Sequence, residues 1–203
     1  MTHLFDFSNP LRVAMWALFL VAFYSFLRKS YLVVDRADQV SPKVILRSDL
    51  HFDASFAYLT VRASKTIQFR ERLFSLPLPR IPGSLLCPVA ALVHHVRINQ
   101  VHQDLPLFSV RSANSVSPIT YVHFSSFLAR VIEAVGLDST GYSPHSFRRG
   151  GATFAFEAQV PSELMKAQGD WRSDCYFIYL EMSDRQKRAA ATRMASAISH
   201  IAV

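Results

Sequence analysis

Four separated stretches of the sequence place basic or phenolic side chains next to apolar runs. In chain order they read "FLRKSYL", "ASKTIQ", "HSFRRGGAT" and "GDWRSDCYFIYL". The side chains in them that could do chemistry are Arg28, Lys65, His145, Arg148 and Tyr179.

These side-chain types together fit one reaction, the transfer of a phosphodiester to a hydroxyl group. A phosphodiester is negatively charged and gains charge in the transition state, and the guanidinium groups of Arg28 and Arg148 could each hold two of its oxygens. The Tyr179 hydroxyl has an ordinary pKa of about 10, so it needs such a clamp and a nearby base to act as a nucleophile. A lysine or histidine must then protonate the leaving 5′-oxygen.

Each stretch alone also has a purely structural explanation. Arg28 and Lys29 could be the last residues of a helix, where the helix dipole favours positive charge. A lysine in a turn is usually solvated, and His145 could cap its helix. Tyr179 could be a core tyrosine with its hydroxyl at the edge.

The reaction needs no metal ion or cofactor, and we expect neither. The nearest approach to a ligand cluster is His94, His95 and His102. His94 and His95 are adjacent, so on a helix they point to different faces and do not share a metal ion.

The first part of the chain predicts one long helix and a small sheet that would position these residues. Residues 8–28 begin with "SNP", an N-cap followed by proline, and continue as an apolar helix that ends near Arg28. Residues 49–80 contain the short alternating runs "DLHF", "FAYLTVRA" and "RLFSLPLP", which predict an antiparallel sheet with Lys65 in its last turn.

From Pro88 onward the pattern is helical. It predicts helices over "VAALVHHVRINQ" and over "YVHFSSFLARVIEAVG", the second of which stops at Gly136. Pro144 opens the helix that carries His145, and Pro161 opens a short helix that ends at Gly169. Two more are expected over "SDCYFIYLEM" and "SDRQKRAAATRMASAISHIA".

The composition of the chain indicates which classes of binding partner to expect. The net charge of +7 favours a polyanion, which is nucleic acid or an anionic membrane surface. Residues 13–27 are apolar but shorter than the roughly 20 residues that cross a bilayer, so we expect a buried helix there. Cys87 and Cys175 lie far apart, which argues against a disulfide framework.

The order and wording of the four stretches resemble the catalytic domain of tyrosine recombinases, the phage-integrase family, and are most similar to versions from eukaryotic mobile elements. The resemblance implies an α+β fold, mostly helical, that breaks and rejoins DNA over residues 1–182. It implies that residues 183–203 form a C-terminal helix that docks on a neighbouring protomer, within a tetramer on double-stranded DNA.

The resemblance also implies roles for individual residues. Tyr179 would attack DNA to form a 3′-phosphotyrosyl link, and Lys65 would be the general acid. The phosphate would be held by Arg28, Arg148, His145 and Trp171. We expect further DNA contacts from Arg149, Arg172 and Arg62.

The sequence departs from the family pattern in several places. Asp170 follows the glycine where the family usually has His or Trp, so we assign that role to Trp171. Tyr31 replaces an acidic residue that often follows the first arginine, and Tyr176 is a rival nucleophile. The N-terminal DNA-clamping domain is expected to be absent, which would leave weak DNA affinity.

Other functions stay open at this point. They are a domesticated DNA-binding module without catalysis, a type IB topoisomerase and a membrane-surface protein. We expect no membrane partner, and a nuclear location if the host is eukaryotic or a cytoplasmic one otherwise.

Overall fold

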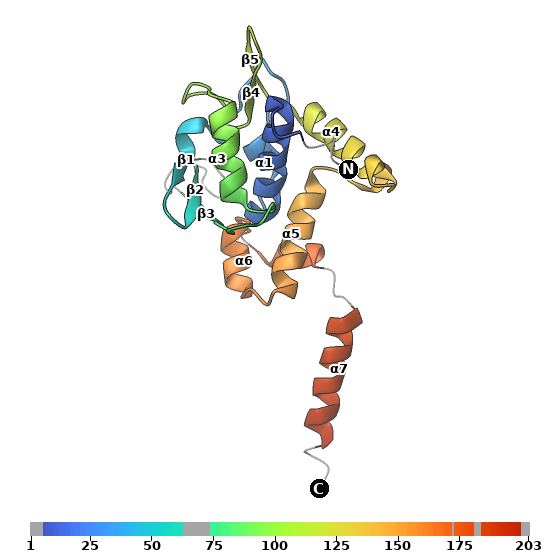
Figure 1. Ribbon diagram of the computed structural model, residues 1–203. Coiled ribbons are helices and arrows are strands. Elements are labelled where there is room, and N and C mark those ends of the chain that lie inside the picture. The colour runs from blue at the N-terminus through green and yellow to red at the C-terminus, as the bar shows by residue number, and fades with distance from the viewer. Residues whose placement is uncertain (1–5, 63–73, 172, 181–183, 200–203) are drawn as a thin grey trace.

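The computed structural model describes residues 6–62, 74–171, 173–180 and 184–199 (Figure 1). Lys65, with the turn assigned to it, and Arg172 lie outside these ranges. None of the described helices combines the length and the apolar content that crossing a bilayer requires. Within the same ranges, no three His, Cys, Asp or Glu side chains come together to hold a metal ion.

Helix α1 (Pro10–Ser25) forms the centre of the molecule, as its apolar sequence predicts (Figure 1). It begins at Asn9, whose side chain accepts a hydrogen bond from the Arg12 amide, and Pro10 occupies the first turn. Helices α3 (Pro88–Ile98) and α5 (His145–Glu157) pack against it, so its apolar residues are buried on several sides.

The end of α1 differs from the expectation. The helix stops at Ser25 because Phe26 adopts a left-handed conformation with φ of 52°, which directs the chain away from the helix axis. Arg28 therefore precedes the short helix α2 (Lys29–Leu32) and does not belong to the last turn of α1. The dipole explanation for Arg28 is wrong for this reason.

The expected antiparallel sheet is confirmed, with the order β1 (Leu50–Phe52), β2 (Phe56–Val61) and β3 (Phe74–Pro79). Alternate residues of β2 and β3 are buried, as the alternating sequence predicts. Pro77 and Pro79 are tolerated because β3 is an edge strand. A second hairpin, β4 (Ser109–Arg111) with β5 (Val116–Pro118), was not predicted.

The remaining helices follow the expected order. Helix α4 (Tyr121–Ala134) is followed by Gly136 with φ of 80°, and α6 (Ser162–Gln168) is followed by Gly169. Helix α7 (Asp184–Ser199) lies apart from the rest of the molecule (Figure 1). The side chain of Met194 on α7 is 67% exposed.

The core has two parts. The larger cluster surrounds α1 and includes the inner face of the sheet. The smaller cluster joins the end of α1 to α5, α6 and the segment that carries Tyr179, and its members are Phe26, Ala152, Ala155, Met165, Trp171 and Tyr176. The candidate site is built on this smaller cluster.

Candidate active site

A close approach between α5 and the end of α1 positions the first arginine of the site. Gly151 faces the backbone of Phe23 and the ring of Phe26 so closely that a Cβ atom at this position would overlap both. Arg148 lies three residues earlier on α5, and its Nη1 donates a hydrogen bond to the carbonyl oxygen of Phe26. The glycine thus allows the contact that fixes the guanidinium of Arg148.

Arg148 is a buried cation, with 2% of its surface exposed. Its Nε and Nη2 atoms have no hydrogen-bond partner among the described residues, and no described carboxylate forms an ion pair with it. Burial lowers its pKa to about 10, with a further contribution from Arg28, and Tyr179 partly opposes the change. The group is therefore charged at neutral pH, and two of its nitrogen atoms can still donate to an anion.

Trp171 covers Arg148. The guanidinium carbon lies 4.1 Å from the centre of the indole ring, which is a cation–π contact. Asp170 has a left-handed conformation with φ of 50°, and Trp171 turns back so that its amide donates to the Lys166 carbonyl at 3.0 Å. The ring then lies directly on Gly169, where any Cβ atom would overlap it.

Tyr179 and Tyr176 lie on the 3₁₀ helix η3 (Asp174–Tyr179), where a longer α-helix was expected. Residues three apart are eclipsed in a 3₁₀ helix, so both rings lie next to Trp171, with centroid distances of 6.0 and 5.7 Å. Tyr176 is buried, whereas Tyr179 is partly exposed. The end of η3 is fixed by the hydroxyl of Thr153, which donates to the Tyr179 carbonyl at 2.6 Å.

His145 is the first residue of α5 and lies beside the nucleophile candidate. Its ring and that of Tyr179 are edge to face with centroids 5.2 Å apart. Pro144 occupies the N-cap position, so His145 does not cap its helix as the structural explanation proposed. Burial lowers the pKa of His145, and the charges of Arg148, Arg28 and Arg149 lower it further, so the imidazole is neutral at pH 7.

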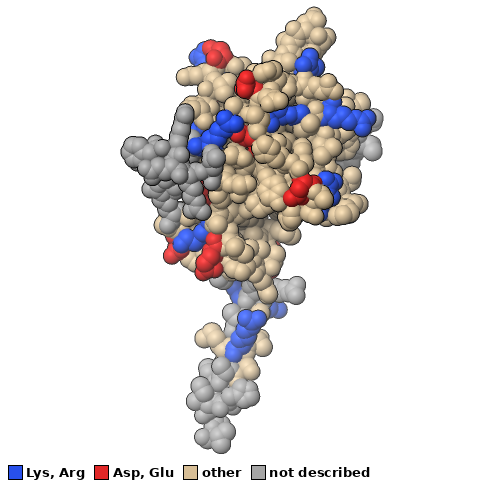
Figure 2. All heavy atoms as spheres, turned by 90° about the vertical axis from the view of Figure 1, so that its left-hand side faces the viewer, with Lys and Arg blue, Asp and Glu red and all other residues tan. Residues whose placement is uncertain are grey.

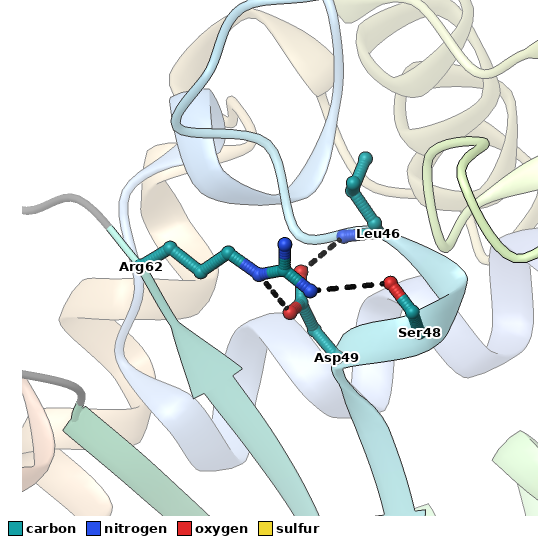
Figure 3. Close-up of polar contacts among 4 residues, drawn as sticks. All are labelled: Leu46, Ser48, Asp49 and Arg62. Atoms are coloured by element: carbon teal, nitrogen blue, oxygen red, sulfur yellow. Dashed lines mark hydrogen bonds and ion pairs between the residues drawn. The ribbon is translucent and has the colours of Figure 1, made fainter.

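The other predicted residues are distributed as follows. Arg28 is half-buried at the start of α2, and its charge acts on both His145 and Arg148. Arg149 is exposed on α5. Arg62 lies at the end of β2, where its guanidinium contacts Asp49 and Ser48 (Figure 3).

Four supporting residues were not identified from the sequence, and they are Phe26, Gly151, Thr153 and Gly169. The adjacent glycines in "RRGGAT" and the glycine of "GDW" were the available signals. Gly151 and Gly169 are each explained by a contact with a residue whose position the sequence did not show.

Charge on the side of the molecule that carries the sheet is not gathered into one track. In Figure 2 the Lys and Arg side chains form separate groups, several of them next to Asp or Glu. Among the described residues, Lys166 pairs with Asp174 at 2.8 Å and Arg36 pairs with Asp38 at 3.1 Å. The site residues Arg148 and His145 come instead from α5.

Known proteins share this fold but little sequence. No family model and no curated protein matches the chain. The site-specific recombinase XerH, bound to its difH substrate, matches with a TM-score of 0.60 and 14% identity over 90% of this chain and 47% of that one. FLP recombinase in a Holliday junction complex matches with a TM-score of 0.53 and 13% identity, over 81% and 40% of the two chains.

A third structure is the integrase of the transposon Tn1549 in complex with circular intermediate DNA. Its TM-score is 0.51 at 11% identity, over 86% of this chain and 56% of that one. This chain thus spans about half the length of each of the three structures. The comparisons confirm the expected α+β fold of a tyrosine recombinase catalytic domain.

Proposed function

We propose that the chain is the catalytic part of a tyrosine recombinase and that it breaks and rejoins double-stranded DNA. The observation that carries this proposal is Arg148, a buried cation with two nitrogen atoms available to an anion, next to a partly exposed tyrosine. A buried cation that has no carboxylate partner among the described residues is costly, so such a group is expected to serve a bound anion. The fold shared with recombinases supports DNA phosphate as that anion.

The proposed reaction uses Tyr179 as the nucleophile. Its oxygen bonds to the phosphorus atom as the bond from phosphorus to the 5′-oxygen breaks, giving a 3′-phosphotyrosyl link and a free 5′-hydroxyl. Neutral His145 can accept the tyrosine proton, which agrees with its lowered pKa. Lys65 donates a proton to the leaving 5′-oxygen, and attack by another 5′-hydroxyl reverses the sequence.

The positive groups stabilise the transition state. Arg148 donates from Nε and Nη2 to the non-bridging oxygens, and Arg28 adds a second positive charge. Trp171 holds the guanidinium of Arg148 through its ring face, and donation from its indole N–H to the phosphate remains part of the proposal. Arg149 and Arg172 would contact neighbouring phosphates.

We also propose how the protein assembles on DNA and what kind of genetic element encodes it. Helix α7 lies apart from the rest of its chain, which agrees with docking on a neighbouring protomer in a tetramer on DNA. We propose that its biological setting is site-specific recombination or integration by a mobile element, and that this element is related to mobile elements of eukaryotes.

Covalent capture tests the proposal without knowledge of the target site. The substrate is a pool of duplexes with a randomised central block and a nick on one strand. After cleavage, the short fragment between the cleaved bond and the nick diffuses away with its 5′-hydroxyl. The reverse reaction then lacks its hydroxyl group, and the protein stays covalently attached. We expect a covalent adduct with the wild type and with Tyr176→Phe, and none with Tyr179→Phe, which should still bind DNA. Absence of adduct from the wild type would refute the proposed function.

A further inference from the structure

The ladder between β1 and β2 ends before β2 does. Its last pair is Leu50 with Leu59, so Thr60 and Val61 are paired only with β3. An ion pair between Asp49 and Arg62 begins where this ladder stops (Figure 3). The end of β2 is therefore held on its β1 side by side chains and not by backbone hydrogen bonds.

Asp49 is firmly anchored. Only 2% of its side chain is exposed, and one carboxylate oxygen accepts from the Leu46 amide at 2.8 Å. Its neighbours in the 3₁₀ helix η1 (Arg47–Asp49) are tied to a distant loop, because the amides of Arg47 and Ser48 donate to the carbonyls of Leu105 and Gln103. The carboxylate is thus held by η1 and the loop behind it, in addition to the β1–β2 pairing that begins at the next residue, Leu50.

Arg62 is held by η1 through two of its nitrogen atoms. Its Nε donates to the other oxygen of Asp49, and its Nη2 donates to the Ser48 hydroxyl at 3.2 Å. This is a fork geometry that lysine does not reproduce. Arg62 is the first residue after β2, and Lys65 follows it by three residues.

We propose that Asp49 is a positioning residue that acts through Arg62 on the chain that leads to Lys65. The inference rests on the proposed function, in which Lys65 is the general acid. A general acid must lie within hydrogen-bond distance of the leaving oxygen, and a displacement of about 1 Å can cost on the order of 100-fold in rate. The ion pair between Asp49 and Arg62 fixes the end of β2, from which the chain continues to Lys65. In this proposal the guanidinium of Arg62 binds Asp49 and does not bind a DNA phosphate.

The test compares two leaving groups in single-turnover cleavage of DNA selected by covalent capture. One substrate is an ordinary phosphodiester, and the other has sulfur in place of the 5′-bridging oxygen, which leaves without a proton. Lys65→Ala should slow the first by roughly 10²–10⁴-fold and the second little. Asp49→Asn and Arg62→Lys should show the same selectivity, with the ordinary substrate slowed by roughly 10–100-fold and the sulfur substrate by less than about 3-fold.

Controls separate positioning from loss of structure and from DNA binding. Asp38→Asn breaks the exposed pair with Arg36 and should leave both rates unchanged. If Asp49→Asn does not fold, the two rates are compared in Arg62→Lys alone. This variant is expected to fold because it keeps a positive charge opposite the buried carboxylate. Thermal melting and DNA affinity are measured for each variant.

The outcomes distinguish the two proposals. Equal slowing of both substrates, or wild-type rates, in folded Asp49→Asn and Arg62→Lys would overturn the positioning role. Weaker DNA binding by Arg62→Ala, with normal binding by Asp49→Asn, would overturn it by assigning Arg62 to a phosphate. Failure of the wild type to form any adduct would refute the proposed function itself, and this inference with it.

Discussion

Replacement of Arg148 by lysine tests the central cation of the site most sharply. The change keeps a positive charge but replaces three donor nitrogen atoms in a plane by one ammonium group. In the structure, Nη1 is already used by the Phe26 carbonyl, and Nε and Nη2 are the two atoms that remain for a phosphate. A lysine cannot satisfy the carbonyl and both phosphate oxygens in this geometry.

The expected cost follows from the donors that are lost. Removal of one transition-state donor typically costs about 2–4 kcal/mol, which is roughly a 30- to 900-fold loss in cleavage rate. The burial and the Arg28 charge that lower the pKa of Arg148 would act on the lysine too, and its ordinary pKa is closer to neutral. The variant should therefore lose further activity as the pH rises, because the lysine gives up its charge at a lower pH than the arginine does.

The assay is single-turnover formation of the covalent adduct, with DNA binding and thermal melting measured in parallel. Arg130→Lys is the matched control, because Arg130 is an exposed arginine on α4 that also lies next to an aromatic ring, that of Phe127. The control should keep the wild-type rate. An Arg148→Lys protein that folds and cleaves within about 3-fold of the wild type would remove Arg148 from the phosphate clamp.

Three further predictions follow from the same structure. Gly169→Ala should displace Trp171 from Arg148, destabilise the fold by about 1–3 kcal/mol and abolish cleavage, because the added Cβ overlaps the Trp171 ring. Chemical denaturation and adduct formation measure the two effects, and unchanged stability would contradict this overlap. Burial lowers the pKa of His95 from 6.5 to about 4. Neutral His95 therefore contributes fully to the free energy of unfolding above pH 6.5, and about 3 kcal/mol of that free energy is lost as the pH falls to 4. Denaturant titrations should show a smaller loss of stability over this pH range in His95→Gln. Deletion of residues 184–203 should leave a folded domain that binds DNA but does not assemble, measured by light scattering with DNA and by thermal melting, and an insoluble product would show that α7 belongs to the core of its own chain.

The sequence predicted the elements whose signals are local. Asn9 and Pro10 mark the start of α1, and the alternation in β2 and β3 marks the sheet. Gly136 marks the end of α4 as expected. In each case the residue that specifies the element lies within it or next to it.

The features that sequence reasoning missed depend on contacts that the sequence does not display. Phe26 ends α1 in a left-handed conformation that usually favours glycine, and its carbonyl contacts Arg148, 122 residues away. Gly169 was read as a helix stop, although its lack of a side chain is what allows the Trp171 ring to lie on it. The pairing of Arg62 with Asp49 was not expected, because it exists only in the folded sheet.

The central claim is that Tyr179 forms a covalent bond to DNA, and mass spectrometry of the captured adduct tests it most directly. After nuclease and trypsin digestion, the peptide that follows Arg172 contains both Tyr176 and Tyr179, so fragmentation can place the attached nucleotide on one of them. We expect the added mass on Tyr179, which is partly exposed next to His145 and Arg148. A nucleotide on Tyr176, or on no tyrosine of this peptide, would contradict it.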